Sequence, residues 1–259
     1  MEYEFITYHT EQRITYITLN RPDKRNALNF DVVTELQNAF DKANKDENCK
    51  IIVLKANGKA FCAGADLDFL QKLQNFTFED NYRDSSHLAK LFNQIYDLGK
   101  VVIAQIQGPA LAGGCGLATI CDFSFAAQSA QFGYTEARIG FIPAIVMVFL
   151  IRKIGEGKAR ELLLSADIID ANKAKEYGLI NYVVPDHLLE NEVKNFALRL
   201  CEQNSAQSLN FTKHMIADLQ NMSLRDAIEF ASKMNAEARA NEDCKRGIKA
   251  FLNKEKITW

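Results

Sequence analysis

The chain has 259 residues, of which 47% are hydrophobic and 25% are charged, so it is long enough to bury one large core. Its formal net charge of −2 supplies no basic field for nucleic acid or for an anionic membrane surface. An anionic ligand must therefore be bound locally, by a few lysines and arginines or by the N-terminal ends of helices.

The cysteines and the apolar segments indicate the compartment. Six cysteines, none in a CxxC pair, are typical of reduced thiols in an intracellular protein. The N-terminal sequence MEYEFIT is acidic and has too short an apolar stretch for a secretory leader. The longest apolar run, residues 141–151, is shorter than the roughly 20 residues that cross a bilayer. We therefore expect a soluble, cytoplasmic protein that binds no nucleic acid and no membrane.

Strands and helices alternate up to about residue 186, which is typical of an α/β fold. Runs of β-branched and aromatic residues predict the strands, and apolar residues three and four apart predict the helices. The predicted elements are, in chain order, a strand at 13–19, a helix capped by Asn29 or Asp31, a strand at 51–56, a helix at 83–98, a strand at 101–106, a helix at 113–120, a strand at 123–127, a helix at 156–164 and a strand at 180–185.

After Asp186 the pattern becomes entirely helical. Three helices are predicted, at 187–203, 205–220 and 223–241, and no further strand. Such a tail either packs on its own core or docks on a neighbouring chain. We therefore divide the chain into a core, residues 1–190, and a C-terminal helical region, residues 191–259.

The signatures of several enzyme classes are missing. The four histidines are scattered, with no HExxH and no paired Cys/His spacing, so no metal site is expected. The sequence contains no GxSxG of serine hydrolases, no phosphate loop GxxxxGK[ST] and no GxGxxG fingerprint. The sequence therefore gives no support to a zinc enzyme, a serine hydrolase or a nucleotide-binding protein.

Two glycine-containing turns that follow buried strands are the candidates for a site: FCAGADL at 61–67 and GPALAGG at 108–114. Small residues there let the backbone approach a ligand closely. The second turn enters a predicted helix, whose free N–H groups favour developing negative charge. Two such N–H groups could bind one oxygen as an oxyanion hole, or both turns could be tight connections without a ligand.

Four segments, in order along the chain, resemble successive motifs of the enoyl-CoA hydratase/isomerase (crotonase) superfamily: NRPDKRNALN, KAFCAGADL, IQGPALAGGCGLATICDFSFAAQSAQFGYTEARIGFIP and KAKEYGLINYVVP. They cover about residues 13–190. The resemblance implies a spiral of ββα units of the ClpP/crotonase kind, with a C-terminal helical region that assembles homotrimers or homohexamers. It also implies an acyl-CoA thioester as substrate, and no cofactor other than the coenzyme A of that substrate.

The resemblance assigns roles to individual positions. It places two oxyanion donors at the backbone N–H groups of Ala65 and Gly113, which would hold the thioester oxygen as it becomes an enolate. It places the coenzyme A portion of the ligand along segments that contain Lys24, Arg25, Ala27, Ala63, Asp66 and Leu67. The two cations, Lys24 and Arg25, could contact phosphates or could belong to a solvated turn.

The carboxylates depart from the pattern that the resemblance leads us to expect. Hydratases of the family commonly have one glutamate in a Gly-Gly-Cys-Glu helix and a second in a Phe-Gly-x-x-Glu turn. The second is Glu136, whereas Gly116 stands at the position of the first. We expect Glu136 to be the acid/base, since a shielded pocket raises the pKa of a carboxyl toward neutral pH. Gly116 either opens space for a bulkier or carboxylated acyl group or allows close helix packing.

Three other polar or reactive side chains receive structural interpretations. Asp122 lies between a predicted helix and a predicted strand, and we interpret it as a structural carboxylate. Cys62 and Cys115 flank the proposed oxyanion donors, but the chemistry needs no thiol nucleophile. We expect both cysteines to be small, buried packing residues.

Three functions remain open. The first is a lyase that adds water to a 2-enoyl-CoA in fatty acid metabolism. The run TEARIGFIPAIV resembles a methylglutaconyl-CoA hydratase-like subgroup, which would place this reaction in branched-chain amino acid degradation. The second is a 3,2-enoyl-CoA isomerase, in which the single Glu136 carries a proton between Cα and Cγ. The third, suggested by Gly116, is a protein that binds CoA esters with little catalysis.

Overall fold

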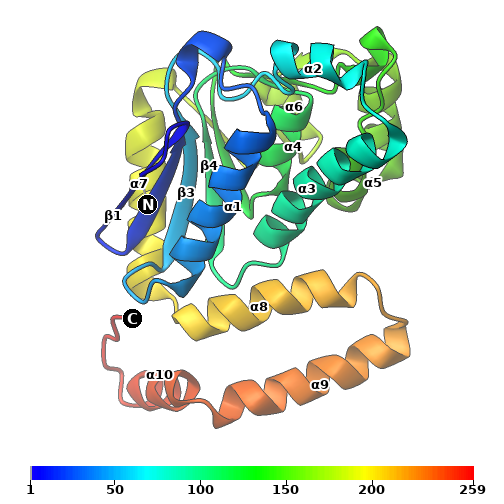
Figure 1. Ribbon diagram of the computed structural model, residues 1–259. Helices are drawn as coiled ribbons and strands as arrows, with labels where there is room; N and C mark the ends of the chain where they lie inside the picture. Colours follow the sequence, from blue (N-terminus) through cyan, green and yellow to red (C-terminus); the bar gives the residue numbers. More distant parts are fainter. Residues whose placement is uncertain (1) are drawn as a thin grey trace.

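A six-stranded sheet forms the centre of the structure, a computed structural model that describes residues 2–259 (Figure 1). Its strands, in spatial order, are β1 (Ile6–Glu11), β2 (Ile14–Leu19), β3 (Ile51–Ala56), β4 (Val101–Ile106), β6 (Phe123–Ala127) and β9 (Tyr182–Val184). β1 and β2 are antiparallel, and all other neighbours are parallel. The central strands are buried almost throughout, because helices cover both faces of the sheet.

The main core lies on the face covered by α1 (Phe30–Lys45), α3 (Phe78–Tyr96), α4 (Gly113–Ile120) and α5 (Ala144–Ser165). α1 begins where the sequence predicts, because the Asn29 side chain accepts a hydrogen bond from the Val32 N–H. The opposite face of the sheet is covered by α7 (Leu189–Gln203), which follows the short turn η3 (Asp186–Leu188). The sheet is therefore the middle layer of three.

A second, smaller sheet lies at one end of the first. It consists of β5 (Ala110–Leu111), β7 (Gln131–Gly133) and β8 (Ile168–Asp170), and α6 (Ala171–Glu176) follows β8 directly. β5 and β7 are parallel, whereas β7 and β8 are antiparallel. This sheet positions both the start of α4 and the segment that carries Glu136.

Three helices form a layer beneath the main body: α8 (Ala206–Leu219), α9 (Leu224–Ala240) and α10 (Glu242–Leu252) (Figure 1). Lys213 of α8 ties this layer to the core, since its Nζ donates to Asp122 Oδ2 at 2.7 Å and to the Lys100 carbonyl at 3.0 Å. The same Asp122 oxygen accepts from the Val102 N–H at 2.7 Å. Asp122 is thus the structural carboxylate that the sequence predicts.

The α/β class is confirmed, as are the five strands and the order of the helices predicted from the sequence. Four strands and three α-helices were not predicted: β1, β5, β7, β8, α2 (Leu67–Leu73), α6 and α10. The helix predicted at 156–164 is only the second half of α5, which is interrupted at Gly155, where φ is 77°. Its first half is the apolar run at 144–151.

The boundary expected between the core and the C-terminal helical region falls inside a helix, so that helix contains residues of both parts. The expected boundary at residues 190 and 191 lies within the first turn of α7, which packs against the sheet. The layer that stands apart from the sheet begins with α8. Within residues 2–259, no helix combines the length and the hydrophobicity needed to span a bilayer.

We predict that Lys213→Ala destabilises the protein by about 2 kcal/mol, because it leaves the Asp122 carboxylate, which is only partly exposed, without its cation. The free energy of unfolding in urea measures the loss. Lys233→Ala is the control: Lys233 pairs with Glu229 on α9, where both side chains are exposed, and its free energy of unfolding should match that of the wild type. Equal stability of Lys213→Ala and the wild type would contradict the link between layer and core.

Candidate active site

Parallel backbone pairing brings three distant segments side by side. An isolated bridge pairs Cys62 with Ala110, and β5 in turn pairs Ala110 with Phe132 of β7. Since both pairings are parallel, the three segments continue in the same direction. They lead to the two predicted oxyanion donors and to Glu136, which therefore approach one another at the same end of this small sheet.

The two glycine turns pack backbone against backbone. A Cβ on Gly64 would lie 2.7 Å from the Cβ of Ala112, and a Cβ on Gly114 would lie 2.2 Å from the Cys62 carbonyl oxygen. Side chains do not fit at either position, so glycine is required there for packing. Ala112 has φ 50° and ψ −127°, a rare conformation for a residue with a side chain. Such conformations cluster at functional sites, where the surrounding structure holds them.

The backbone N–H groups of Ala65 and Gly113 have no acceptor within the part of the chain that the structure describes. The peptide around Ala65 is fixed on both sides, since the Leu28 N–H donates to the Gly64 carbonyl at 2.7 Å and the Asp66 N–H donates to the Leu28 carbonyl at 2.8 Å. Gly113 is the first residue of α4, so its N–H lies at the positive end of that helix. Both groups are free to donate to a ligand.

Glu136 is the only buried residue of the short turn η2 (Glu136–Ile139). Its Oε2 atom is buried and has no hydrogen-bond partner among residues 2–259. Burial raises the pKa of the Glu136 carboxyl above its ordinary value of 4.5. A buried carboxyl with a raised pKa and an unpartnered oxygen is suited to take up and return a proton, which is what acid/base catalysis requires.

Gly116 is packed closely between helices. A Cβ at this position would lie 2.2 Å from Val146 Cγ1 and 2.9 Å from Phe92 Cε1. Val146 of α5 and Phe92 of α3 therefore fill the place where hydratases commonly have their first glutamate. The expectation that Gly116 opens space for a larger or carboxylated acyl group is wrong, and the alternative, close helix packing, is confirmed.

The sequence matches the family described as Enoyl-CoA hydratase/isomerase over residues 9–259, which is nearly the whole chain. The chain belongs to this family. The crotonyl-CoA hydratase of Syntrophomonas wolfei is 35% identical over 266 residues, which cover 100% of this chain and 99% of that protein. The mitochondrial enoyl-CoA hydratase of Pongo abelii is 35% identical over 244 residues, covering 94% and 82%.

Solved structures show the same relationship. An enoyl-CoA hydratase from Bacillus anthracis superposes with a TM-score of 0.91 at 32% identity and covers 99% of both chains. One from Shewanella pealeana gives a TM-score of 0.92 at 30% identity, covering 99% of this chain and 96% of the other. The crotonase fold is therefore confirmed, and the protein is an enzyme of the hydratase/isomerase family.

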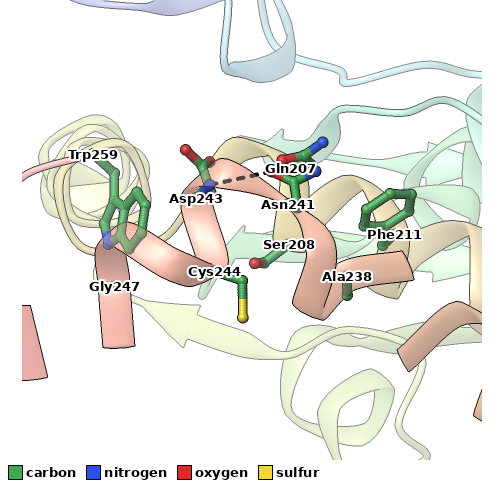
Figure 2. Close-up of a pocket in the computed structure, with 9 residues that line it drawn as sticks. All are labelled: Gln207, Ser208, Phe211, Ala238, Asn241, Asp243, Cys244, Gly247 and Trp259. Atoms are coloured by element: carbon green, nitrogen blue, oxygen red, sulfur yellow. Dashed lines mark hydrogen bonds between the residues drawn. The ribbon is translucent and has the colours of Figure 1, made fainter. Parts of the chain in front are cut away.

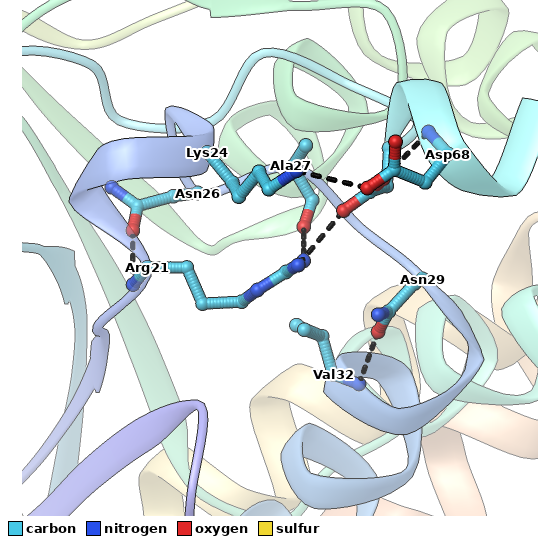
Figure 3. A network of polar contacts seen from close by, with 8 residues as sticks. Arg21, Lys24, Asn26, Ala27, Asn29, Val32 and Asp68 are labelled. Carbon is cyan, nitrogen blue, oxygen red and sulfur yellow. Dashed lines mark hydrogen bonds and ion pairs between the residues drawn. The ribbon is translucent and has the colours of Figure 1, made fainter.

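The residues that the resemblance assigns to coenzyme A lie around η1 (Pro22–Lys24) and the start of α2 (Figure 3). Lys24 Nζ donates to Asp68 Oδ2 at 2.9 Å, with both side chains largely exposed. Arg25 is also exposed and has φ 50°. Its carbonyl accepts from the Ala63 N–H at 3.1 Å, which ties the two segments together. Leu67 is 80% exposed, so a ligand can approach from this side.

Asp66 and Ala27 are buried, and Arg21, which was not predicted to matter, binds both. Arg21 Nη2 donates to Asp66 Oδ2 at 2.8 Å. Its Nη1 donates to the Ala27 carbonyl at 2.9 Å (Figure 3). The Asp66 carboxylate also caps α2 by accepting from the Asp68 N–H at 2.9 Å. Burial raises the pKa of Asp66, but the hydrogen bonds from Arg21 and Asp68 outweigh it and hold the pKa below its ordinary value. The Asp66 side chain therefore has a structural role.

Cys62 and Cys115 are fully buried, as the sequence predicts. Burial raises the pKa of each thiol to about 12, so both stay protonated at neutral pH. Neither thiol can serve as a nucleophile there. Within residues 2–259, no three His, Cys, Asp or Glu side chains converge in a way that could hold a metal ion.

A cavity of about 160 Å³ lies within the C-terminal layer, away from these residues (Figure 2). Its lining comes from α8, α9, α10 and the C-terminal Trp259. The Trp259 N–H donates to the Glu202 carbonyl at 3.1 Å, and Arg13 Nη1 donates to the Trp259 carbonyl at 2.7 Å. None of the predicted site residues lines this cavity, so it plays no part in the site.

We predict that Glu136→Gln becomes more stable than the wild type as the pH rises. The folded state binds the Glu136 proton more tightly than the unfolded state, so unfolding releases protons and wild-type stability falls as pH rises through the interval between 4.5 and the raised pKa. Glutamine does not ionise, so the variant escapes this penalty, which is absent below pH 4.5 and complete above the raised pKa. Urea unfolding of both proteins over a pH series measures the difference, and a constant difference would contradict the raised pKa.

Proposed function

We propose that the protein adds water across the 2,3 double bond of an enoyl-CoA, with Glu136 as the single acid/base. The observation that carries this proposal is the convergence of two free backbone donors and a buried carboxyl with one unpartnered oxygen at the ends of three parallel segments. The likeness to proteins named enoyl-CoA hydratase and crotonyl-CoA hydratase supports the same substrate class.

The backbone donors suit the charge that develops in this reaction. Attack of water at Cβ moves electron density onto the thioester oxygen, which becomes an enolate oxygen. We propose that the Ala65 and Gly113 N–H groups bind this oxygen, and loss of one such donor costs about 3–4 kcal/mol of barrier. Ionised Glu136 would take a proton from the attacking water and then return it to Cα, so that the carboxylate is regenerated.

We propose that the coenzyme A portion lies along Lys24, Arg25, Ala27, Ala63, Asp66 and Leu67. Support comes from the exposure of Lys24, Arg25 and Leu67 around the start of α2. Ala27 and Asp66 are buried and would contribute through their backbone. Lys24 is already paired with Asp68, so a phosphate there would replace a carboxylate that is itself exposed. The proposed chemistry is acid/base chemistry on a thioester and calls for no further cofactor.

The packing at Gly116 favours a second function, 3,2-enoyl-CoA isomerisation. Val146 and Phe92 occupy the place of a second carboxylate, and proton transfer between Cα and Cγ needs one carboxyl and no bound water. A branched, methylglutaconyl-like acyl group rests on the likeness of residues 135–146 alone. Gly116 provides no extra room for such a group.

We predict that the purified protein removes the ultraviolet absorbance of straight or branched 2-enoyl-CoAs and incorporates oxygen from labelled water at Cβ. Glu136→Gln should lower kcat by about 10²- to 10⁴-fold. Conversion of a 3-enoyl-CoA to a 2-enoyl-CoA with deuterium exchange at Cα, and no added oxygen, would establish isomerisation instead. If Glu136→Gln left turnover unchanged, the assigned role of Glu136 would be wrong. If the wild-type protein showed no turnover at all, it would be a protein that only binds CoA esters.

A matched pair of variants isolates the oxyanion donor in the same assay. Gly113→Pro removes the N–H while keeping the first helical position, where proline is tolerated, and should lower kcat by about 10²- to 10³-fold. Gly113→Ala keeps the N–H and adds a Cβ that would lie 3.5 Å from Leu28 Cδ1, an ordinary contact. The difference between the two variants measures the N–H itself, and equal rates would exclude this donor.

We also propose that the protein assembles into homotrimers or homohexamers through residues 191–259. The C-terminal layer exposes large apolar side chains, and α9 buries none of its residues. These exposed side chains are Ile216, Leu224, Ile228, Ile248, Phe251 and Leu252. Light scattering should give three or six times the chain mass of 29.2 kDa, and Leu224→Asp together with Ile228→Asp should lower it. A mass of one chain would refute the assembly.

A cytoplasmic location is the last part of the proposal. All six cysteines are free thiols, and five of them are buried. Free thiols are typical of a reducing compartment. Cell fractionation tests this location, and recovery of the protein from an oxidising compartment would contradict it.

A further inference from the structure

The segment that carries Glu136 has few anchors. Residues 137–142 are all exposed, and their backbone hydrogen bonds, such as that from the Phe141 N–H to the Glu136 carbonyl at 3.0 Å, stay within the segment. An ion pair of 3.9 Å joins Arg138 to Asp167, but both side chains are exposed. On the other side of Glu136, Tyr134 is fully buried. The position of the carboxyl therefore depends on what holds the Tyr134 side chain.

The Tyr134 hydroxyl is bound to α4. Thr119 Oγ1 donates to the Cys115 carbonyl at 2.7 Å, and this uses the one hydroxyl proton of threonine. The hydrogen bond of 2.9 Å between Tyr134 and Thr119 must therefore be donated by the phenol. Both partners are buried, with exposed fractions of 0% for Tyr134 and 3% for Thr119.

This hydrogen bond joins the two halves of the candidate site. α4 runs from Gly113 to Ile120, so Thr119 lies about 9 Å along the same rigid helix from the proposed oxyanion donor. Tyr134 lies between β7 and Glu136 in the chain. Glu136 is buried and lies only two residues from Tyr134 in the chain. Burial is the main cause of the raised pKa of Cys115 and of Tyr134, and the charge of Glu136 adds to both.

We infer that Tyr134 is a positioning residue, whose hydrogen bond to Thr119 sets the place of the Glu136 carboxyl relative to the Gly113 N–H. This inference rests on the proposed role of Glu136. A base acts only within hydrogen-bond distance of the proton it moves, and a misplacement of about 1 Å can cost about 10²-fold in rate. The bridge also keeps the segment closed against α4, which protects the carboxyl from water.

Tyr134→Phe tests the inference, because it removes the hydroxyl and keeps the ring. We expect kcat to fall about 10- to 100-fold, with KM within about twofold, on whichever of hydration or isomerisation the protein catalyses. We also expect the acidic limb of kcat/KM to move to lower pH, because water admitted beside Glu136 returns its pKa toward 4.5. A residue that served folding alone would lower the amount of folded enzyme and leave this limb in place.

Two variants at Thr119 examine the other end of the bridge. Thr119→Val should show the same loss of kcat and the same shift of the acidic limb as Tyr134→Phe. Thr119→Ser keeps the hydroxyl and should have the kcat and the pH profile of the wild type. The double variant Tyr134→Phe/Thr119→Val should lose no more than the larger single loss, since both changes break one hydrogen bond. If Tyr134→Phe fails to fold, the contrast between valine and serine at position 119 decides.

The matched control is Tyr16→Phe. Tyr16 is a buried tyrosine of β2, 6% exposed, on the face of the sheet that α7 covers. Its variant should keep both kcat and the pH profile. Folded Tyr134→Phe with wild-type kcat and an unmoved acidic limb would overturn the inference and leave the proposed function intact. Unchanged turnover in Glu136→Gln would instead remove the proposed function on which the inference rests.

Discussion

The close approach of backbone to backbone at the small sheet is the constraint on which the site depends. Cys62, Ala110 and Phe132 are paired in parallel, so three segments turn toward the same point. The segments approach this closely because Gly64 and Gly114 have no Cβ, which would clash with the neighbouring segment at either position. Two free N–H groups and a carboxyl can then lie together without any of them being adjacent in sequence.

The site itself works against stability, whereas the far end of the helix that presents Gly113 is well satisfied. Glu136 has a buried, unpartnered oxygen, and Ala112 has a rare backbone conformation. The C-terminal carbonyls of α4, by contrast, accept from Lys153, whose ammonium donates to Thr119 and Cys121. A partly buried cation at the C-terminal end of a helix satisfies its last carbonyls and complements its dipole. The helix that presents Gly113 is thereby held firmly at its other end.

Local patterns were sufficient for most of the long elements of the fold, and they singled out the segments that form the candidate site. The strands at 51–56 and 101–106 are continuous apolar runs, as expected when helices cover both faces of a sheet. β5, β7 and β8 have only two or three residues each, too few to show any periodicity. The first half of α5 was missed because its apolar residues lie on exposed as well as buried sides of the helix: Val146 and Leu150 are buried, whereas Val148 and Ile151 are exposed. Such a run shows no helical stripe.

The sequence by itself determined the family, the two glycine turns and the lone Glu136, because motifs are runs of neighbouring residues. Only the tertiary structure decided what surrounds them. It showed that Val146 and Phe92 fill the space beside Gly116, and that Arg21 donates a hydrogen bond to the Asp66 carboxylate. It also showed that Tyr134 donates to Thr119. Each of these contacts joins residues that lie well apart in the chain, and close packing between elements, which local sequence does not record, selects the partner.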